Sequence, residues 1–543
     1  MITPIWKVSQ KNYSQENKDW LLKILAKNRG LTTKKELDKF LNPTIEQILN
    51  VQVTDLGKAV NRVEQALKNK EKVIVYSDYD ADGICASAIV WETLFALGVD
   101  IMPYVPHRLK EGYGLSISAI EEHASKGINL IITVDHGVTA VKQIETAKKL
   151  GIDVIVTDHH VKPKFLPKPH ALVHTTALCG AGVAWRFCWE IVKKIKPAYK
   201  VELLQKLELA AIATVADLVP LAGANRTIVK LGLENLNKTK RAGLISLIKS
   251  AGIADPITAY EIGHLIAPRI NAMGRLEHGL DSLRLLCAKN IKKADELASL
   301  LSTTNTKRQS LTTYAADQAL TMVDSNQLVG VLYHNSWHEG IIGLVASKLV
   351  EKHYRPMIAI SSGPKFSKGS ARSIPGFNII EAIRASSEFL IDAGGHPMAA
   401  GFSIKTKYIE TFSKQINVYA QKAISEEMLT PVLKIECKLN VEDINYQTLK
   451  LIKTFEPYGI GNPQPIFLTE HMLIEDIRGV GLTSKHLKLQ ISGKGAIGFN
   501  MGEKRYKLRP TDLVDVVYSI EEDNFNGKGK IQMKIKDIRS SSF

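Results

Sequence analysis

The sequence predicts an α/β protein with two lobes joined by a long helix and followed by a small all-β domain. Three observations support this prediction. Short β-branched runs alternate with helical patterns from Lys72 onward, and a second alternation begins near Leu328. After Pro431, short alternating runs are joined by Gly and polar turns. Strand–helix alternation indicates a parallel sheet with crossover helices, and closely spaced strands indicate a barrel or sandwich.

In the first lobe, each predicted strand is a short apolar run that precedes a helical pattern. The strands are VIVYS (73–77), a run near 101–105, INLIITV (128–134) and DVIVT (153–157), and the helices are 84–97, 116–126, 138–150 and those within 181–217. Residues 1 to about 50 are predicted to form short helices that contribute side chains to a core. Such continuous apolar strands are typical of a parallel sheet covered on both faces.

A polar, amphipathic stretch from about Ile291 to Met322 has few breakers and is predicted to join the lobes as one helix. The second lobe contains strand LVGVLYH (328–334), helix 341–352, a strand near 357–360 and helix 408–426. KIECKL, HLKLQI, AIGFN, DLVDVVYSI and IQMKIKDI are predicted barrel strands. We therefore expect an N-terminal helical segment (1–50), a catalytic lobe (51–290), a connecting helix (291–325), a substrate-binding lobe (326–428) and a barrel (429–543).

Composition narrows the class of protein. The chain has 543 residues with 71 Lys and Arg against 55 Asp and Glu, a net charge of +16. This surplus favours an anionic partner, with nucleic acid first and an acidic membrane surface second, although a generally basic proteome would give the same value. The five scattered cysteines contain no C-x-x-C pair, which argues against disulfides or a thiolate zinc site. No apolar run is long enough to span a membrane, and a cytoplasmic location is expected.

Acidic and histidine side chains follow three predicted strands directly. They are Asp78, Asp80 and Asp82, then Asp135 and His136, then Asp158, His159 and His160. Ligands of open α/β sheets bind at the carboxyl edge, where clustered carboxylates repel one another unless a cation neutralises them. Oxygen-rich ligands with histidine suit Mn²⁺ or Mg²⁺. The i, i+2, i+4 spacing of the first three acids predicts that they share one face of an extended chain.

Two alternatives stay open at this point. DYDADG by itself is also typical of a turn with solvated aspartates. Asp217 lies in the apolar run ATVADLVPL, where a buried carboxylate needs a partner. That partner is either a metal ion or a core salt bridge.

The ordered motifs DYDADG, VDHG, TDHH and the Asp of ATVADLVPL resemble those of the DHH phosphoesterase superfamily. Five further segments resemble motifs of its bacterial single-strand-specific 5′→3′ exonucleases. They are APRINAMGR (267–275), WHEGIIGLVASKL (337–349), GSARS (369–373), GGHPMAAGF (394–402) and PYGIGNPQPIF (457–467), the last at the entry to an OB-fold. The resemblance covers nearly the whole chain.

This resemblance implies a centre for two divalent cations, Mn²⁺ or Mg²⁺. It assigns one ion to Asp78, Asp80 and Asp135, and the other to Asp82, Asp135, His159 and Asp217, with Asp135 bridging. His160 then faces the scissile phosphate, Asp158 supports the histidines, and His136 counts among the catalytic residues.

The resemblance also implies a substrate-binding set. Arg108, Ser370 and Arg372 are expected to hold a 5′ phosphate, with Ser370 and Arg372 in a predicted small-residue loop. A solvated surface Arg and a turn His are the structural alternatives for Arg372 and His396. The remaining expected contacts are Tyr113 at the rim, His396 near the substrate, Arg269, Asn271, Arg275 and His338 along the strand, and Lys485, Lys488 and Tyr506 in the barrel.

The implied function is degradation of single-stranded DNA from the 5′ end to mononucleotides, in DNA repair and recombination. A nano-RNA or bisphosphate phosphatase of the same superfamily and a non-catalytic DNA-binding scaffold are the rival functions. Single-stranded DNA is the expected partner of a monomeric protein, with a single-strand-binding protein or a helicase as further candidates.

Overall fold

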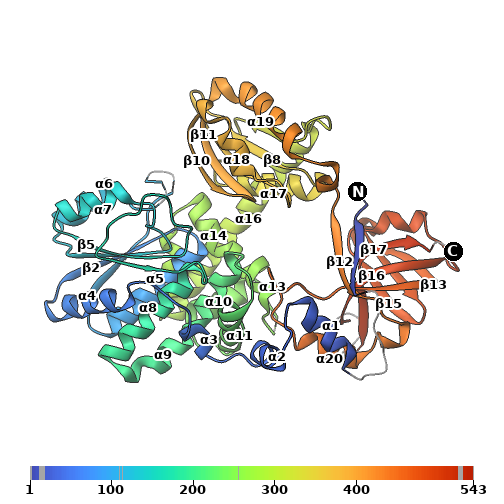
Figure 1. The fold of residues 1–543 in the computed structure, drawn as a ribbon, viewed down its shortest axis with the longest axis horizontal. Helices are drawn as coiled ribbons and strands as arrows, with labels where there is room; N and C mark the ends of the chain where they lie inside the picture. Colours follow the sequence, from blue (N-terminus) through green and yellow to red (C-terminus); the bar gives the residue numbers. More distant parts are fainter. Residues whose placement is uncertain are drawn as a thin grey trace. The chain divides into compact units, whose positions relative to one another are not determined.

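A computed structural model describes residues 3–10, 19–108, 111–112, 114–254, 256–523 and 530–541. The chain divides into two compact units (Figure 1). The first consists mainly of Val53–Asp217 and Asn235–Pro431, and the second of Trp6–Gln52, Leu218–Glu234 and Val432–Phe543. Residues 218–234, which were expected in the catalytic lobe, therefore group with the barrel and the N-terminal segment.

The first lobe contains a five-stranded, fully parallel sheet in the order β3-β2-β4-β5-β6. Its strands are β2 (Lys72–Ser77), β3 (Asp100–Tyr104), β4 (Leu130–Val134), β5 (Asp153–Asp158) and β6 (Ala171–His174). The predicted parallel sheet is confirmed. The strand β6 was missed because residues 159–170, which lead to it from β5, contain no helix. The alternation of strands and helices therefore breaks off before this last, four-residue strand.

Helices cover both faces of this sheet. They are α4 (Leu56–Lys68), α5 (Ala81–Ala96), α6 (Ile117–Ser125), α7 (Val141–Lys149) and α8 (Gly180–Ile195), and α10 (Leu207–Ala216) packs against α5 and α8. Ile131 and Val156 pack with residues of α6 and α7 on one face, while α5 and α8 contact the other (Figure 1). β4 is buried along its whole length, which explains why all its residues except Thr133 are apolar.

A buried ion-pair network supports this helical layer. Arg241 donates to Glu92 Oε1 at 2.6 Å, to Glu208 Oε1 at 2.9 Å and to the carbonyl of Leu286 at 2.7 Å. Burial raises the pKa of Glu92, but Arg241 and Lys206 outweigh it and hold this pKa at about 2. The folded-state pKa is depressed, so the stabilisation is complete above the ordinary pKa of 4.5 and is lost as the pH falls towards 2.

Replacing Arg241 by methionine is expected to lower the free energy of unfolding by about 3–5 kcal/mol, because the buried Glu208 loses its ion-pair partner and Glu92 retains only Lys206. Thermal or urea denaturation measures the change. Arg284→Met is the control, since its ion pair with Asp281 is exposed and is worth less than about 1 kcal/mol. Equal changes in the two variants would show that the buried network contributes no special stability.

The predicted connecting helix is α16 (Ile291–Thr321), which leads into a second lobe with a mixed five-stranded sheet, β10-β11-β9-β8-β7. The strands are β7 (Gly330–His334), β8 (Met357–Ser361), β9 (Phe366–Arg372), β10 (Leu390–His396) and β11 (Ala399–Lys405), and the helices are α17 (Ile342–His353), α18 (Ile379–Arg384) and α19 (Ile409–Ala423). β7 and β8 are parallel, and the other neighbours are antiparallel.

The prediction of a loop at Ser370 and Arg372 was wrong, because both residues lie in strand β9. GGHPMAAGF likewise forms part of a hairpin of β10 and β11. Small residues are needed here for packing between strands rather than for a turn. A Cβ atom on Gly369 would come within 2.2 Å of the Phe402 ring on the neighbouring strand.

The second unit contains a closed barrel in the order β13-β14-β15-β17-β16. Its strands are β13 (Phe467–Val480), β14 (His486–Ile491), β15 (Lys494–Gly498), β16 (Leu513–Glu522) and β17 (Ile531–Ser540). The predicted small β-barrel is confirmed. KIECKL, however, is not a barrel strand: β12 (Val432–Cys437) pairs with β1 (Ile5–Gln10) in a separate two-stranded sheet. The N-terminal segment therefore begins with a strand, before helices α1 (Trp20–Asn28), α2 (Lys34–Leu41) and α3 (Glu46–Leu49).

Among the helices that the structure describes, none combines the length and the apolar character needed to cross a membrane.

Candidate metal centre

The three acidic motifs meet at the carboxyl edge of the first-lobe sheet. Asp78 follows β2 directly, Asp135 follows β4, and Asp158 is the last residue of β5. These three side chains are almost completely buried, with 4%, 2% and 1% of their residue surface exposed. The edge that the sequence predicted is therefore where the acids gather.

The first motif does not have the predicted extended geometry. Asp80 is the N-cap of α5, and its Oδ1 accepts a hydrogen bond from the Gly83 amide at 3.0 Å. Asp82 lies in the first turn of the helix. Aspartate is a preferred N-cap, and acidic side chains in a first turn interact favourably with the helix dipole. The helix therefore starts inside the motif and separates Asp82 from Asp78.

The acids and His159 form two neighbouring groups. Asp78, Asp80 and Asp135 have ligand atoms within 4.8 Å of one another, and so do Asp82, His159 and Asp217. His159 Nε2 lies 3.8 Å from Asp82 Oδ2 and 3.7 Å from Asp217 Oδ2. It also lies 3.2 Å from Asp135 Oδ1, so Asp135 adjoins both groups. These groups have the members that the resemblance assigned to two ions.

Asp217 is the C-cap of α10. Within the described part of the chain, no Lys or Arg lies at salt-bridge distance from its carboxylate, and its ion-pair contact is with His159. The alternative of a core salt bridge is therefore not found. The residue after it, Leu218, has a positive φ of 58° and ends the helix there.

The electrostatics of the site favour a bound cation. Burial, followed by the neighbouring carboxylates, raises the pKa of Asp82 to about 7 and that of Asp217 to about 8. The same causes raise the pKa of Asp78 and of Asp135 well above the ordinary range. Burial, then His160, lowers the pKa of His159 to about 4. Protein groups alone therefore do not stabilise the ionised carboxylates, whereas divalent cations would.

The donor atoms of the site also fit divalent cations. His159 Nε2 is buried and makes no hydrogen bond to any residue that the structure describes. Asp82 is oriented by the start of α8, because its oxygens accept from the amides of Gly180 at 2.7 Å and Ala181 at 2.6 Å. Carboxylate oxygens with one imidazole nitrogen suit Mn²⁺ or Mg²⁺.

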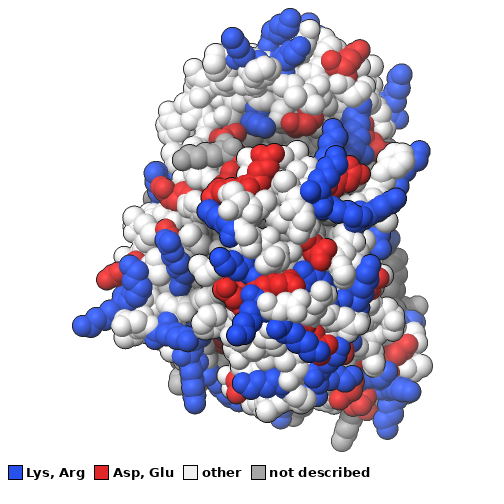
Figure 2. Space-filling view, turned by 90° about the vertical axis from the view of Figure 1, so that its left-hand side faces the viewer, with Lys and Arg blue, Asp and Glu red and all other residues white. Residues whose placement is uncertain are grey.

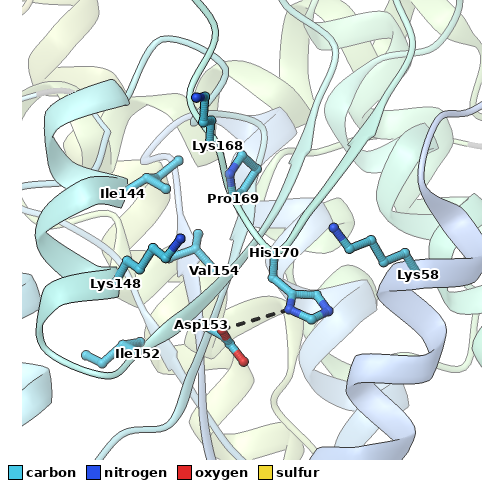
Figure 3. A pocket seen from close by; sticks show the side chains of 9 residues that line it. All are labelled: Lys58, Ile144, Lys148, Ile152, Asp153, Val154, Lys168, Pro169 and His170. Atoms are coloured by element: carbon cyan, nitrogen blue, oxygen red, sulfur yellow. Dashed lines mark ion pairs between the residues drawn. The ribbon is translucent and has the colours of Figure 1, made fainter.

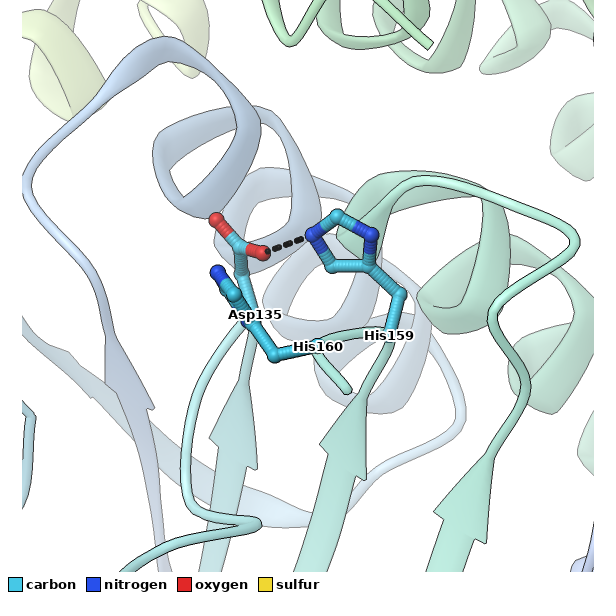
Figure 4. Close-up of side chains that lie close together, drawn as sticks. All are labelled: Asp135, His159 and His160. Carbon is cyan, nitrogen blue, oxygen red and sulfur yellow. Dashed lines mark ion pairs between the residues drawn. The ribbon is translucent and has the colours of Figure 1, made fainter. Parts of the chain in front are cut away.

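Asp158 orients the two histidines that follow it. Its Oδ1 accepts from the backbone amides of His159 at 2.7 Å and His160 at 3.0 Å, and it lies 2.8 Å from His160 Nδ1. These contacts outweigh the effect of burial and hold the pKa of Asp158 well below its ordinary value, while Asp158 raises the pKa of His160 to about 9 against burial. Figure 4 shows His159 and His160 on either side of the Asp135 carboxylate.

His136 lies apart from these groups. Its Nε2 lies 3.0 Å from the carbonyl of Tyr76, and its ring packs edge-on against the Tyr76 ring. Burial lowers its pKa to about 4. These contacts hold the ring against Tyr76, and the expected catalytic role of His136 stays a prediction.

The structure adds one contributor to the site and a second contact for a residue already considered. A Cβ atom on Gly180 would come within 2.5 Å of Asp135 Oδ1, so this glycine leaves room for the carboxylate. Its place in the small-residue run CGAGVA was the available signal. Asn271, expected as a strand contact, accepts from the Ala81 amide at 2.7 Å and so anchors the turn that carries Asp80 and Asp82. Asn271 lies on α14 (Ala267–Leu276).

Of the arginines expected to contact the substrate, Arg108 acts on the pKa of Asp78, and Asp80 acts on that of Arg275. The Arg108 guanidinium lies 5.1 Å from the centre of the Tyr79 ring, and Arg372 donates to Ser370 Oγ at 3.3 Å. Burial, then repulsion from Arg108, Arg308 and Arg372, lowers the pKa of Arg275 to about 10.

The other predicted contacts have mixed outcomes. His396 is exposed at the end of β10, and it lies near enough to His159 to lower the pKa of that residue. Tyr113 lies outside the described residues. In the barrel, Tyr506 is exposed as expected, but Lys488 is half-buried and lies 3.2 Å from Gln532 Oε1.

A separate cavity of about 250 Å³ lies at the opposite edge of the sheet (Figure 3). It is lined by Lys58, Lys148, Lys168, His170, Asp153 and apolar neighbours. Asp153 begins β5, whereas the metal-ligand candidates follow the strand ends. Asp153 already pairs with Arg62 at 2.6 Å. The cavity is therefore distinct from the acidic groups.

Surface charge alone does not locate a binding path. On the face drawn in Figure 2, Lys and Arg side chains are spread widely, with Asp and Glu between them. The net charge of +16 is consequently not concentrated in one block on this face.

Comparisons with known proteins follow the same division of the chain. Residues 72–216 match the model of the DHH family, N-terminal domain, and residues 325–422 match that of the DHHA1 domain. Residues 435–537 match the RecJ OB domain. The expected fold class, with two lobes and an OB-fold, is thus confirmed.

The chain is similar to RecJ proteins over nearly its full length. It is 35% identical to the single-stranded-DNA-specific exonuclease RecJ of Bacillus subtilis, covering 96% of this chain and 68% of that protein. The structure of Thermus thermophilus RecJ in complex with Mn²⁺ matches with a TM-score of 0.87 at 28% identity, covering 99% of this chain and 80% of the other. The Mg²⁺ complex of that protein gives a TM-score of 0.79 at 27% identity, with 99% and 79% covered.

Proposed function

The chain belongs to the RecJ family of single-stranded-DNA-specific exonucleases, and we propose that it hydrolyses single-stranded DNA from the 5′ end to mononucleotides with two divalent cations. The observation that supports this proposal most directly is the pair of acidic groups that adjoin at Asp135. One isolated group would suit a single structural ion, whereas two neighbouring groups suit an in-line displacement at phosphorus.

Each side chain has a definite part in this proposal. Asp78, Asp80 and Asp135 would hold one cation, and Asp82, Asp135, His159 and Asp217 would hold the other. Bound divalent cations, Mn²⁺ or Mg²⁺, would supply the nucleophilic hydroxide and charge stabilisation for the leaving oxygen.

The supporting residues fix these ligands in place. Asp158 orients the backbone of His159 and the ring of His160, which faces the scissile phosphate. The amides of Gly180 and Ala181 fix the Asp82 carboxylate. Ligands that are held in this way need little reorganisation when the substrate binds.

Polarity is proposed to come from a terminal-phosphate site formed by Arg108, Ser370 and Arg372. Ser370 and Arg372 face the first turn of α17, where a Cβ atom on Gly343 would come within 2.9 Å of both side chains. The amides of a first helical turn and a half-buried guanidinium can both donate to one phosphate. A 5′-phosphorylated end held there would present its next phosphodiester to the cations.

Arg372→Ala is expected to erase most of the preference for a 5′ phosphate over a 5′ hydroxyl, which is about ten- to a hundredfold for one charge-assisted contact. The quantity to measure is the ratio of rates on the two ends, with bound Mn²⁺ determined in parallel. Arg384→Ala, an exposed change on α18 in the same lobe, is the control. An unchanged ratio with both cations bound would mean that polarity is set elsewhere.

The exonuclease proposal itself is tested with oligonucleotides labelled at the 5′ or the 3′ end, single-stranded or in blunt duplex, in Mn²⁺. Labelled mononucleotide is expected at once from the 5′-labelled single strand and late from the 3′-labelled one, with little from duplex. Early release from the 3′ end, or equal rates on duplex, would contradict it.

The rival functions have less support. The match to an OB domain distinguishes the chain from a phosphatase built of the two lobes alone. The five acids of the two groups, together with Asp158, argue against a non-catalytic scaffold. A monomeric state, a cytoplasmic location, a role in repair and recombination, and contacts with a single-strand-binding protein or helicase stay predictions. The predicted domain boundaries also stay a proposal, amended by the grouping of residues 218–234 with the barrel.

A further inference from the structure

The buried stripe of the connecting helix α16 changes character at its middle. Near its start the stripe contains Leu297 and Leu301, and near its end Ala315 and Ala319 pack into a second-lobe core with Trp337. Between these apolar ends the stripe is polar: it consists of Thr304, Asn305, Arg308 and Thr312. Arg308 follows Thr304 by four residues and precedes Thr312 by four, so it occupies the same helix face as these buried side chains.

This polar middle lies beside helix α14. The two helices pack together, and Arg269 of α14 donates to Ser302 Oγ of α16 at 3.2 Å. Burial, then repulsion from Arg269, lowers the pKa of Arg308. Arg275, one helical turn and a half beyond Arg269, is affected by Arg308 in the same way. Three half-buried guanidinium groups therefore lie near the contact between α14 and α16.

No carboxylate in the described part of the chain pairs with these arginines at salt-bridge distance. Arg269 and Arg275 use backbone carbonyls, those of Leu265 at 2.7 Å and Gly340 at 3.1 Å. Arg308 Nε is buried and has no hydrogen-bond partner among the described residues. Unpaired buried cations are costly, so this arrangement indicates an anion that comes from outside the chain.

The position of the arginines indicates which part of the substrate this anion belongs to. Arg275 donates to the Gly340 carbonyl, three residues before Gly343, and Gly343 adjoins Ser370 and Arg372 of the terminal-phosphate site. Lys307, next to Arg308, lies 3.7 Å from Glu277, two residues after Arg275, so Arg308 lies level with this end of α14. The 5′ phosphate and the scissile phosphate already have their proposed partners, so a further phosphate bound here belongs to the strand 3′ of the scissile linkage.

We propose that Arg308, together with Arg269, binds a backbone phosphodiester of the single-stranded substrate on the 3′ side of the scissile linkage. The inference rests on the exonuclease function proposed above. Guanidinium groups suit this role because their planar donors match two phosphate oxygens at once. The connecting helix is then a part of the substrate path as well as a link between the lobes.

The test compares a long 5′-phosphorylated oligonucleotide with a 5′-phosphorylated dinucleotide, whose two phosphates are taken up by the terminal site and the cations. Arg308→Gln is expected to raise the KM for the long strand about ten- to a hundredfold and to leave its kcat unchanged. The KM for the dinucleotide should not change. Lys307→Gln is the matched control, because Lys307 is the exposed neighbour and lies 3.7 Å from Glu277.

Salt dependence and a conservative variant separate phosphate binding from a structural role. The slope of log affinity against log salt should become shallower by about 0.7 in Arg308→Gln, the value for one phosphate contact on a single strand. Arg308→Lys retains the charge and should restore the slope. A KM that rises equally for both substrates, or a slope that does not change, would overturn the proposal.

A measurement on the unaltered protein guards against a variant that fails to fold. Oligonucleotides with one neutral methylphosphonate linkage, placed in turn at each of the first positions 3′ of the scissile bond, are compared by KM. One position should give the tenfold or larger rise, and an equal KM at all positions would contradict the site. If the unaltered protein degrades neither the long strand nor the dinucleotide, the exonuclease proposal fails. If it degrades both normally, and neither the Arg308 variants nor the methylphosphonate linkages change the KM, this inference alone is refuted.

Discussion

Asp135→Ala is expected to lower the rate of single-strand hydrolysis about a thousandfold or more. Asp135 adjoins both acidic groups, and its Oδ1 lies 3.2 Å from His159 Nε2. Its loss therefore weakens both proposed cation sites at once. Cations at such a centre contribute several kcal/mol of transition-state stabilisation. Each 1.36 kcal/mol corresponds to a tenfold change in rate, so a loss of about 4 kcal/mol lowers the rate about a thousandfold.

The measurement combines release of acid-soluble nucleotides with the content of bound Mn²⁺. Asp317→Ala is the control, because it removes the same charge from an exposed position on α16. Dialysis of the unaltered protein against a chelator should abolish activity, and added Mn²⁺ should restore it. Full turnover after thorough chelation, or wild-type metal content and rate in Asp135→Ala, would exclude Asp135 as a shared ligand.

The sequence was sufficient to predict the edge at which the acids meet, but not how they divide. Parallel strands end at one edge, so runs such as INLIITV followed by Asp135 locate that edge directly. The division depends on Asp80, whose spacing suits an extended chain and a helix cap equally well. The helix begins at Ala81 in a structure where α5 packs against both the sheet and the neighbouring α8, and the spacing of the acids does not reveal these contacts.

Two strand predictions failed for a related reason. Alternating polarity identifies KIECKL as a half-buried strand but does not identify its partner, which is β1 at the other end of the chain. The small residues of β9 led to the prediction of a loop. In the structure, glycine is required at position 369 because the Phe402 ring lies against it. Long-range contacts determine both features. The connecting helix α16, with a local and continuous pattern, was predicted almost to its ends.

Gly180 illustrates the same limit, because its importance follows from a contact with Asp135, which is distant in the sequence. The residue begins α8, and its amide donates to Asp82 Oδ2 at 2.7 Å. A Cβ atom at this position would come within 2.5 Å of Asp135 Oδ1 and 2.7 Å of its Cγ. These separations are far below van der Waals contact, so the carboxylate would have to move.

Gly180→Ala is therefore expected to lower the rate about a hundredfold, since a displacement of about 1 Å at a reacting centre has effects of that size. Bound Mn²⁺ should fall in parallel. Gly57→Ala on α4 is the matched control, because a Cβ atom there meets nothing within 4 Å and alanine is favoured by about 1 kcal/mol inside a helix. If Gly180→Ala retained both cations and the full rate, the Asp135 carboxylate would not need the position seen here. The shared-ligand role would then have to be fulfilled from another conformation of Asp135. Loss of metal in Gly180→Ala but not in Gly57→Ala would instead show that the absence of a Cβ atom at position 180 keeps the Asp135 carboxylate in place.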